Sequence, residues 1–268
     1  GLGGVGLYCT DFPASHAPRM AVIWTNTTSD MHFEVRRAGR SIRLYTNGVF
    51  HSQYNPANPV AGTVWDLLLL PAFFRPSGTI RRALVLGVGG GAVIRLLHHC
   101  IQPEQIIGVE LDPTHISIAR RFFGVSQRRA DLIEADAVRW LRGYRGRKFD
   151  LIVDDLFGGI DGEPVRAVEA GRAWLTTLSR RLADDGVLVI NFVSARTLRD
   201  ASQIMQQVLP ARFASAFRLG LPGYDNAVGA FVSRPVAARQ LRRTLSRTRI
   251  PGASSLSRLP FRIQRISP

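Results

Sequence analysis

The feature that most constrains the fold is a regular alternation of short apolar runs with helix-like segments from residue 81 onward. The apolar runs have the length and the β-branched content of buried strands; they are ALVLGV, QIIGVEL, ADLIEA, FDLIVDD and GVLVINFV. Helical spacing is found between them, near residues 92–100, 114–123, 136–143, 166–182 and 195–208. Strands and helices that alternate in this way form a parallel sheet with helices on its faces. We therefore predict an α/β fold with a doubly wound, mostly parallel sheet.

The chain before residue 81 has a pattern typical of antiparallel strands. The stretch MHFEVRRAGRSIRLYTNGVF alternates apolar and polar residues on both sides of RAGR, and it contains a second turn signal, TNG. We expect residues 21–58 to form a small antiparallel β-hairpin domain or lid, preceded by a flexible segment, 1–20. The stretch PVAGTVWDLLLLPAFF has the apolar spacing of a helix with one buried face.

The predicted sheet domain covers residues 59–233. Its last two strands, near 212–219 and 226–233, flank GLPGYDN and are expected to form an antiparallel hairpin at the sheet edge. The remaining residues, 234–268, contain nine arginines and no acidic residue. Since this segment is also rich in serine and proline, we predict a basic tail that lies over the surface.

Composition limits the classes of protein to consider. No apolar stretch reaches the roughly 20 residues that a bilayer span needs, and the N-terminal residues lack the features of a secretory signal. The chain has only two cysteines, Cys9 and Cys100, so a disulfide framework is excluded. We expect a soluble, cytoplasmic protein that does not bind a membrane.

The formal net charge of +15 raises the question of a nucleic-acid partner. However, Lys148 is the only lysine, so the other 34 of the 35 basic residues are arginines. A GC-rich coding sequence explains such a bias more simply than selection for a ligand does. We therefore expect a tail that is solvated or packs against the rest of the protein. Binding of a nucleic acid by this tail is the alternative.

Glycines follow the first predicted strand of the sheet. In an open parallel sheet, ligands bind beyond the carboxyl ends of the strands, where the strand order reverses. The run LVLGVGGG places Gly87, Gly89, Gly90 and Gly91 between this strand and the next helix. Glycines allow a sharp turn and let a ligand approach the helix N-terminus. Taken alone, the run also fits an ordinary strand-to-helix turn.

Carboxylates lie at the ends of the next three strands, and the four strand ends together are a stronger signal than any one of them. Glu110 ends the second strand, where it can accept hydrogen bonds from both ribose hydroxyls. Asp136 can accept from the amine of adenine while the N–H of Ala137 contacts the ring, or it can simply cap a helix. Asp154 and Asp155 end the strand that faces the reacting centre. The run G-x-G-G-G differs from the G-x-G-x-x-G of nicotinamide enzymes, so an adenosyl sulfonium fits these groups better.

At these residues the chain resembles the spermidine-synthase-like family of class I S-adenosylmethionine-dependent transferases, over roughly residues 30–233. The resemblance is carried by LYTNGVFHSQY, ALVLGVGGGAVIRLL, GVELDPTHISIARRFF, IEADAVRWL, FDLIVDD and LADDGVLVINFV. It implies a Rossmann-like fold, a dimer, and Asp155 at the position of the catalytic aspartate. It also implies that Glu110 holds the ribose and Asp136 the adenine.

Two departures from the family pattern bear on the reaction. Aminopropyltransferases of the family resemble one another in a loop G-G-G-D-G-G, and this chain has Gly90 at the position of that aspartate. They carry a second aspartate three residues after the catalytic one, where this chain has Gly158. Those carboxylates would hold cationic amines, so their loss should weaken polyamine binding. Asp161, in GGIDGEP, is a candidate replacement.

We therefore expect methyl transfer from S-adenosylmethionine to a small-molecule or protein amine. Aminopropyl transfer from decarboxylated S-adenosylmethionine to a polyamine is the alternative, and a non-catalytic member that binds the cofactor or nucleic acid is the second. Asp155 is the expected proton acceptor, with Asp154 as the other candidate. The amine is expected to lie near Asp161 and near four residues suggested by the family resemblance: His51, Gln53, Tyr54 and Tyr224. No metal site is expected, because no ligand spacing supports one.

Overall fold

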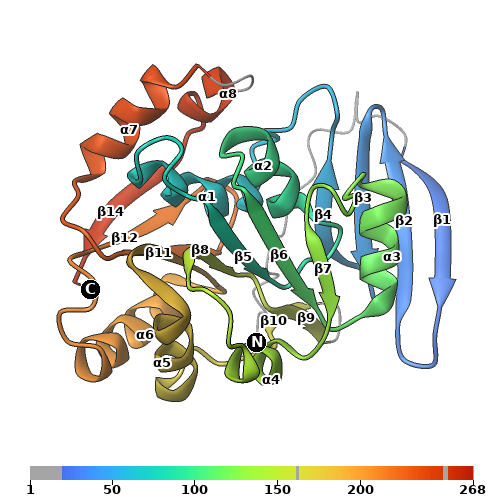
Figure 1. The fold of residues 1–268 in the computed structure, drawn as a ribbon. Coiled ribbons are helices and arrows are strands. Elements are labelled where there is room, and N and C mark those ends of the chain that lie inside the picture. Colours follow the sequence, from blue (N-terminus) through green and yellow to red (C-terminus); the bar gives the residue numbers. More distant parts are fainter. Residues whose placement is uncertain (1–19, 161–162, 250–252, 268) are drawn as a thin grey trace, which may run out of the picture.

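The computed structural model describes residues 20–160, 163–249 and 253–267. Its centre is an eight-stranded mixed sheet (Figure 1) with the order β14-β12-β13-β11-β8-β5-β6-β7. The strands are β5 (Arg82–Leu86), β6 (Gln105–Glu110), β7 (Asp131–Glu134), β8 (Phe149–Asp154), β11 (Leu182–Phe192), β12 (Ser215–Gly220), β13 (Ala227–Val232) and β14 (Arg262–Ile266). The five strands from β11 to β7 are parallel, and the other three are antiparallel. This architecture confirms the predicted fold class.

Side chains of the central strands are apolar on both faces, which explains their continuous apolar runs. In β5, Ala83 and Val85 pack into one core, whereas Leu84 and Leu86 pack into the other. Successive side chains of a strand point to opposite faces of the sheet, so a strand covered on both sides needs apolar residues throughout. The central strands of the sheet are therefore buried on both faces.

Helices form both covering layers (Figure 1). One layer contains α1 (Val64–Leu69), the 3-10 helix η1 (Leu70–Phe74), α2 (Ala92–Cys100) and α7 (Ala238–Arg247). The other layer contains α4 (Ala137–Gly143), α5 (Arg172–Arg181) and α6 (Ala195–Val208). The helix α3 (Pro113–Phe122) lies beside the N-terminal strands and shares the core of the first layer. No helix in the described ranges is long and apolar enough to cross a membrane.

The N-terminal strands form a separate antiparallel sheet, as the alternating pattern predicts. Its strands, in spatial order, are β1 (Ala21–Thr27), β2 (His32–Ala38), β3 (Ser41–Thr46) and β4 (Val49–Tyr54). Asn47 and Gly48 join β3 to β4 with positive φ values of 48° and 78°. That combination is typical of a tight two-residue hairpin turn, which explains the TNG signal.

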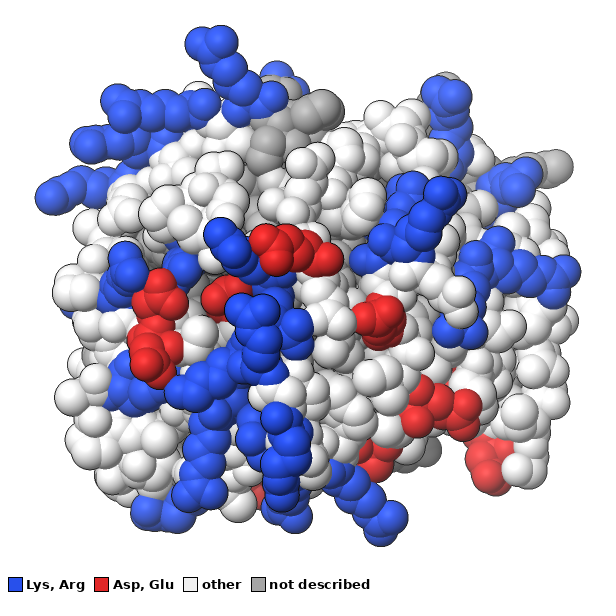
Figure 2. Space-filling view, viewed as in Figure 1, with Lys and Arg blue, Asp and Glu red and all other residues white. Residues whose placement is uncertain are grey.

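The C-terminal segment differs from the predicted surface tail. After α7 it forms α8 (Ala253–Ser257) and then β14, which pairs antiparallel with β12. The hairpin β12–β13 is therefore not the sheet edge, because β14 covers it. Leu241 and Leu245 of α7 are buried against the core while arginines of the same helix are exposed, so an apolar stripe fixes this basic segment. Figure 2 shows the resulting cluster of basic side chains over α7.

A second difference concerns the segment after β8. Instead of a helix from residue 166, the chain forms a short antiparallel pair, β9 (Phe157–Ile160) and β10 (Glu163–Arg166), and α5 begins only at Arg172. The pair lies beyond the carboxyl end of β8. Because β5 is followed in the chain by β6 on one side and borders β8 on the other, the strand order reverses at this point of the sheet.

Candidate functional site

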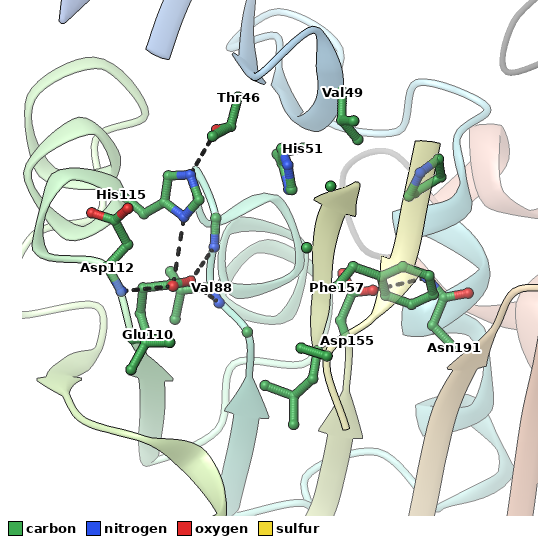
Figure 3. A pocket seen from close by; sticks show the side chains of 18 of the residues that line it. Thr46, Val49, His51, Val88, Glu110, Asp112, His115, Asp155, Phe157 and Asn191 are labelled. Carbon is green, nitrogen blue, oxygen red and sulfur yellow. Dashed lines mark hydrogen bonds and ion pairs between the residues drawn. The ribbon is translucent and has the colours of Figure 1, made fainter. Parts of the chain in front are cut away.

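A cavity of about 640 Å³ lies at this reversal of strand order. Its walls come from the carboxyl ends of the parallel strands, from the turn between β3 and β4, and from the pair β9–β10. Figure 3 shows side chains from these elements pointing toward a common space. The volume is in the usual range for pockets that enclose small molecules.

The glycine turn forms the floor of the cavity, and its glycines have separate structural reasons. Gly87 has a φ of +83°, and a Cβ there would lie 2.3 Å from the carbonyl oxygen of Asp155. Gly91 is the N-cap of α2 in the left-handed conformation, with φ 87°. A Cβ at Gly90 would lie 2.7 Å from Ser52 Cβ. Only Gly87 and Gly89 of the four predicted glycines line the cavity.

Every N–H group of the turn already has an acceptor within the protein. Two of them, from Val88 and Gly89, donate to Glu110 Oε2 at 2.9 Å each. The N–H of Gly90 donates to Ser52 Oγ at 2.9 Å. The remaining two donate to backbone carbonyls: Gly87 to Val109 and Gly91 to Val88. The turn thus presents no free donor to an anion.

Glu110 connects the turn to α3. Its Oε1 accepts from the N–H of Asp112 at 3.1 Å and lies 3.5 Å from His115 Nδ1 (Figure 3). Burial by itself would raise the pKa of Glu110. The hydrogen bond and charge of His115, with the N–H groups of Gly89 and Asp112, outweigh burial and lower the pKa to about 2. Glu110 therefore stays ionised, while the predicted contact with ribose stays a prediction.

Two histidines connect the N-terminal sheet to this carboxylate. His115 Nε2 is hydrogen-bonded to Thr46 Oγ1 at 2.8 Å, so the end of β3 contacts α3 directly. The ring of His51 lies 5.4 Å from that of His115 and lines the cavity. Burial, followed by the charge of His115, lowers the pKa of His51 to about 4. His51 is therefore neutral at physiological pH.

Asp136 and Ala137 lie at the cavity wall beside β6. Asp136 is the N-cap of α4 and accepts from the N–H of Arg139 at 2.7 Å. Asp136 therefore caps α4 and lines the cavity at the same time. Leu111, which follows Glu110, lines the same wall and is 69% exposed. An exposed large apolar side chain beside an exposed carboxylate forms a surface suited to a flat polar ring.

Asp155 points into the cavity from the end of β8. Its Oδ1 accepts from Asn191 Nδ2 at 2.8 Å. Burial is the main cause that raises its pKa to about 6, assisted by the charge of Asp154. The Asn191 hydrogen bond, the charge of Arg166 and a hydrogen bond from Trp65 act in the opposite direction. Asp155 is thus a carboxylate poised near neutral pH, which is the range useful for proton transfer.

Asp154 does not face the cavity. It is fully buried, and its Oδ2 accepts from Arg166 at 2.9 Å and from the Trp174 indole at 2.7 Å. Adjacent strand residues point to opposite faces, so only one of the two aspartates can reach a ligand. Asp154 is therefore a structural ion-pair partner of Arg166. The prediction that it is the alternative proton acceptor to Asp155 is wrong.

The predicted amine-binding residues divide into two groups. His51 and Tyr224 line the cavity. Gln53 accepts from Arg43, and Tyr54 accepts from Arg95 at 2.7 Å, so both side chains point away from the cavity. Strand alternation alone would place His51 and Gln53 on the same face of β4. However, Leu44 pairs with Ser52 and Tyr45 with Phe50, so His51 is an extra, bulged residue of β4, and this bulge gives the two side chains different environments. Asp161 lies outside the described residues.

Sequence reasoning missed several residues that the structure brings into the cavity: Trp65, His115, Asn191 and Asn226. A signal existed for Asn191, because it is a polar residue at the carboxyl end of an apolar strand, as Asp155 is. Trp65 belongs to the helix with one buried face that the apolar spacing predicts, and it also lines the cavity. His115 and Asn226 have no spacing that would have identified them.

The charges of the cavity contrast with those of the chain. Its described lining residues include four carboxylates and no lysine or arginine; the carboxylates are Glu110, Asp112, Asp136 and Asp155. The chain as a whole has a net charge of +15. Figure 2 shows basic side chains spread over the face of the molecule that is in view. The cavity therefore suits cationic ligands.

Comparison with known proteins shows which family the chain resembles in sequence and which structures it resembles in fold. The model of the spermine/spermidine synthase domain matches residues 67–234, which is more than half of the chain. A probable spermidine synthase from Corynebacterium glutamicum has a similar structure, with a TM-score of 0.70 and 18% identity over 86% of this chain and 89% of that one. At this identity the likeness shows the fold alone.

Two curated relatives match shorter regions. Polyamine aminopropyltransferase 2 of Caldanaerobacter subterraneus is 29% identical over 38% of this chain and 35% of its own length. The eEF1A lysine and N-terminal methyltransferase of Mus musculus is 29% identical over 41% of this chain and 17% of its own length. The matched regions thus span about a third or less of these relatives.

Proposed function

The chain belongs to the spermine/spermidine synthase family, and from this premise we propose that it transfers the aminopropyl group of decarboxylated S-adenosylmethionine to an amine. This proposal rests mainly on the negative charge of the residues that line the cavity. Both partners of that reaction are cations, and the cavity is lined by four carboxylates without a described lysine or arginine in a chain of net charge +15. Such a site concentrates cations despite the basic outer surface.

The glycine turn favours the decarboxylated donor over S-adenosylmethionine itself. The intact molecule carries an additional carboxylate, and a helix N-terminus would be its natural partner. All five N–H groups from Gly87 to Gly91 donate within the protein. The first residues of α2, Ala92 and Val93, are buried and do not line the cavity, and the cavity offers no described arginine or lysine. A carboxylate placed there would lose its hydration without compensation. This observation reverses the preference for methyl transfer that the glycine at position 90 suggests.

In the proposed arrangement, Asp136, Ala137 and Leu111 contact the adenine, and Glu110 is next to the ribose. The bound donor supplies a carbon that is activated by the sulfonium group. The nitrogen lone pair of the amine forms the new C–N bond, and the electrons of the broken C–S bond stay on sulfur, which becomes a neutral thioether. Asp155 accepts the proton that the amine loses. Its pKa of about 6 keeps it ionised at neutral pH.

Methyl transfer from S-adenosylmethionine is the second candidate, since a specific observation favours it. Gly90 and Gly158 stand where the family resemblance leads us to expect carboxylates that hold ammonium groups. The mouse relative is named as a methyltransferase of lysine and of an N-terminus, both of which are amines. A protein amine therefore remains an acceptor to test together with small polyamines.

The test combines binding with product analysis. The purified protein is titrated calorimetrically with each donor separately, and then incubated with either donor and a panel of amines that includes 1,4-diaminobutane. Preference for the decarboxylated donor and a product carrying an added aminopropyl group would support the main proposal. Preference for the intact donor and a methylated product would replace it with the second candidate. Binding of a donor without any product, together with salt-sensitive binding of RNA, would indicate a non-catalytic member.

A further inference from the structure

Asn226 extends the hydrogen-bond chain of Asp155 by one residue. Asn191 Nδ2 donates to Asp155 Oδ1 at 2.8 Å, and Asn226 Nδ2 donates to Asn191 Oδ1 at 3.1 Å. Asn226 directly precedes β13, lines the cavity and is only 6% exposed. Its own Oδ1 is buried and has no hydrogen-bond partner in the described part of the chain.

The donor and acceptor roles along these hydrogen bonds follow from Asp155. An ionised carboxylate can only accept, so Asn191 must present its NH₂ group to Asp155. Asn191 then presents its oxygen to Asn226, which must donate in turn. The oxygen of Asn226 is left as the free end. Asp155 and Asn226 Oδ1 are thus two acceptors held in fixed orientation by the amide between them.

The unpartnered Oδ1 of Asn226 suggests that a ligand donates a hydrogen bond to it. A buried acceptor without a partner is costly, and native proteins rarely leave one unexplained. The other buried unpartnered side-chain atoms in the described ranges belong to Asp66, Arg82, Arg95 and Ser202, and none of these residues lines the cavity. Asn226 is therefore the one residue of the described cavity lining whose side chain keeps a buried polar atom without a hydrogen-bond partner.

We propose that Asn226 Oδ1 accepts a hydrogen bond from the attacking nitrogen of the amine and thereby selects primary amines. The inference rests on the proposed transfer to an amine, by either donor. A primary amine that has lost its extra proton keeps two N–H donors, one for Asp155 and one for Asn226, while its lone pair is free to attack. A secondary amine keeps one N–H and would leave one acceptor unpaired.

The test measures transfer to propylamine and to N-methylpropylamine in the wild type, in Asn226→Leu and in a matched control, Asp225→Asn. Asp225 is adjacent and exposed, and it does not line the cavity. In Asn226→Leu we expect the KM for propylamine to rise by about tenfold or more, while donor affinity and the values of Asp225→Asn stay at wild-type levels. The wild-type preference for the primary amine should also shrink, which a merely structural role would not produce.

Two outcomes separate this inference from the proposed function. Wild-type transfer with an unchanged KM and an unchanged preference in Asn226→Leu would overturn the role of Asn226 alone. Absence of wild-type transfer to every amine would overturn the proposed function and this inference with it. If Asn226→Leu loses donor binding because it does not fold, Asn226→Ala replaces it. Alanine has no side-chain group that can accept a hydrogen bond from the amine, so the same changes in KM and preference are expected.

Discussion

Asp154 and Asp155 are consecutive residues whose carboxylates have opposite environments. The Asp154 side chain is fully buried in an ion pair with Arg166, whereas Asp155 faces the cavity and accepts from Asn191. The alternation of side chains at a strand end separates the two groups. Substitution of each aspartate should therefore affect a different property of the protein.

Replacing Asp155 with asparagine should impair the reaction and spare binding of the donor. Asparagine keeps the shape of the side chain but cannot accept the proton from the amine. A positioned general base contributes about 10²–10⁴-fold, so we expect kcat to fall by about this factor. Steady-state kinetics checks the rate, and calorimetry checks that donor affinity is retained. An unchanged kcat would remove Asp155 from the mechanism.

The pH dependence of transfer should follow the ionisation of Asp155. Because its pKa is raised to about 6, the proton-accepting form predominates above this pH, and kcat should fall as the pH drops through it. The Asn191 hydrogen bond lowers this pKa, so Asn191→Ala should raise it and move the acid limb upward by about one pH unit. The control Asn58→Ala changes an exposed amide outside the cavity and should leave the profile unaltered. A downward shift in Asn191→Ala would contradict this account.

Replacing Asp154 with alanine should destabilise the fold. Arg166, whose side chain is 9% exposed, would lose its buried counter-charge, and removal of one partner of a buried pair typically costs about 3–5 kcal/mol. Urea unfolding measures the change in the free energy of unfolding. Asp184→Ala is the control, because Asp184 pairs with Lys148 at the exposed surface and its loss should have no measurable effect. Equal stability of the two variants would refute the structural role of Asp154.

Much of the fold could be predicted because local pattern and burial agree. Apolar runs such as ALVLGV are buried on both faces, and the TNG turn has the positive φ values that its residues favour. The exceptions are β14 and the pair β9–β10. The strand β14 has the sequence RIQRI, and its pairing with β12 is a tertiary contact that no local pattern specifies.

The candidate site is predictable where a residue lies at or just after the carboxyl end of a parallel strand. Glu110 ends β6, Asp136 lies two residues after β7 and Asp155 directly follows β8. All three line the cavity, because the carboxyl ends of parallel strands share one edge. Gln53 and Tyr54 were misplaced because a family resemblance gives no side-chain direction. Asn226 and His115 enter the cavity only through the packing of β13 and α3, which the sequence does not encode locally.

Replacing Glu110 with glutamine should destabilise the protein in a pH-dependent way. The folded-state pKa is lowered to about 2, so Glu110 contributes stability that is fully present above its ordinary value of 4.5 and is lost as the pH falls toward 2. At neutral pH the variant should lose about 3 kcal/mol. Unfolding measured from neutral pH down to about pH 3 should show the difference from wild type shrinking below pH 4.5. A difference that does not vary with pH would mean that the charge of Glu110 is not responsible.

Position 90 should control packing and not the choice of donor. A Cβ on Gly90 would meet Ser52 Cβ at 2.7 Å and the Phe123 ring at 2.8 Å, so Gly90→Ala should cost about 1–3 kcal/mol of stability. Gly143→Ala is the matched control, because a Cβ there meets nothing within 4 Å and should change stability by about 0.5 kcal/mol at most. Gly90→Asp would direct its carboxylate toward Ser52 and Phe123 and away from the cavity. It should therefore not tighten binding of the decarboxylated donor, and calorimetry that shows tighter binding would make residue 90 the determinant of donor choice.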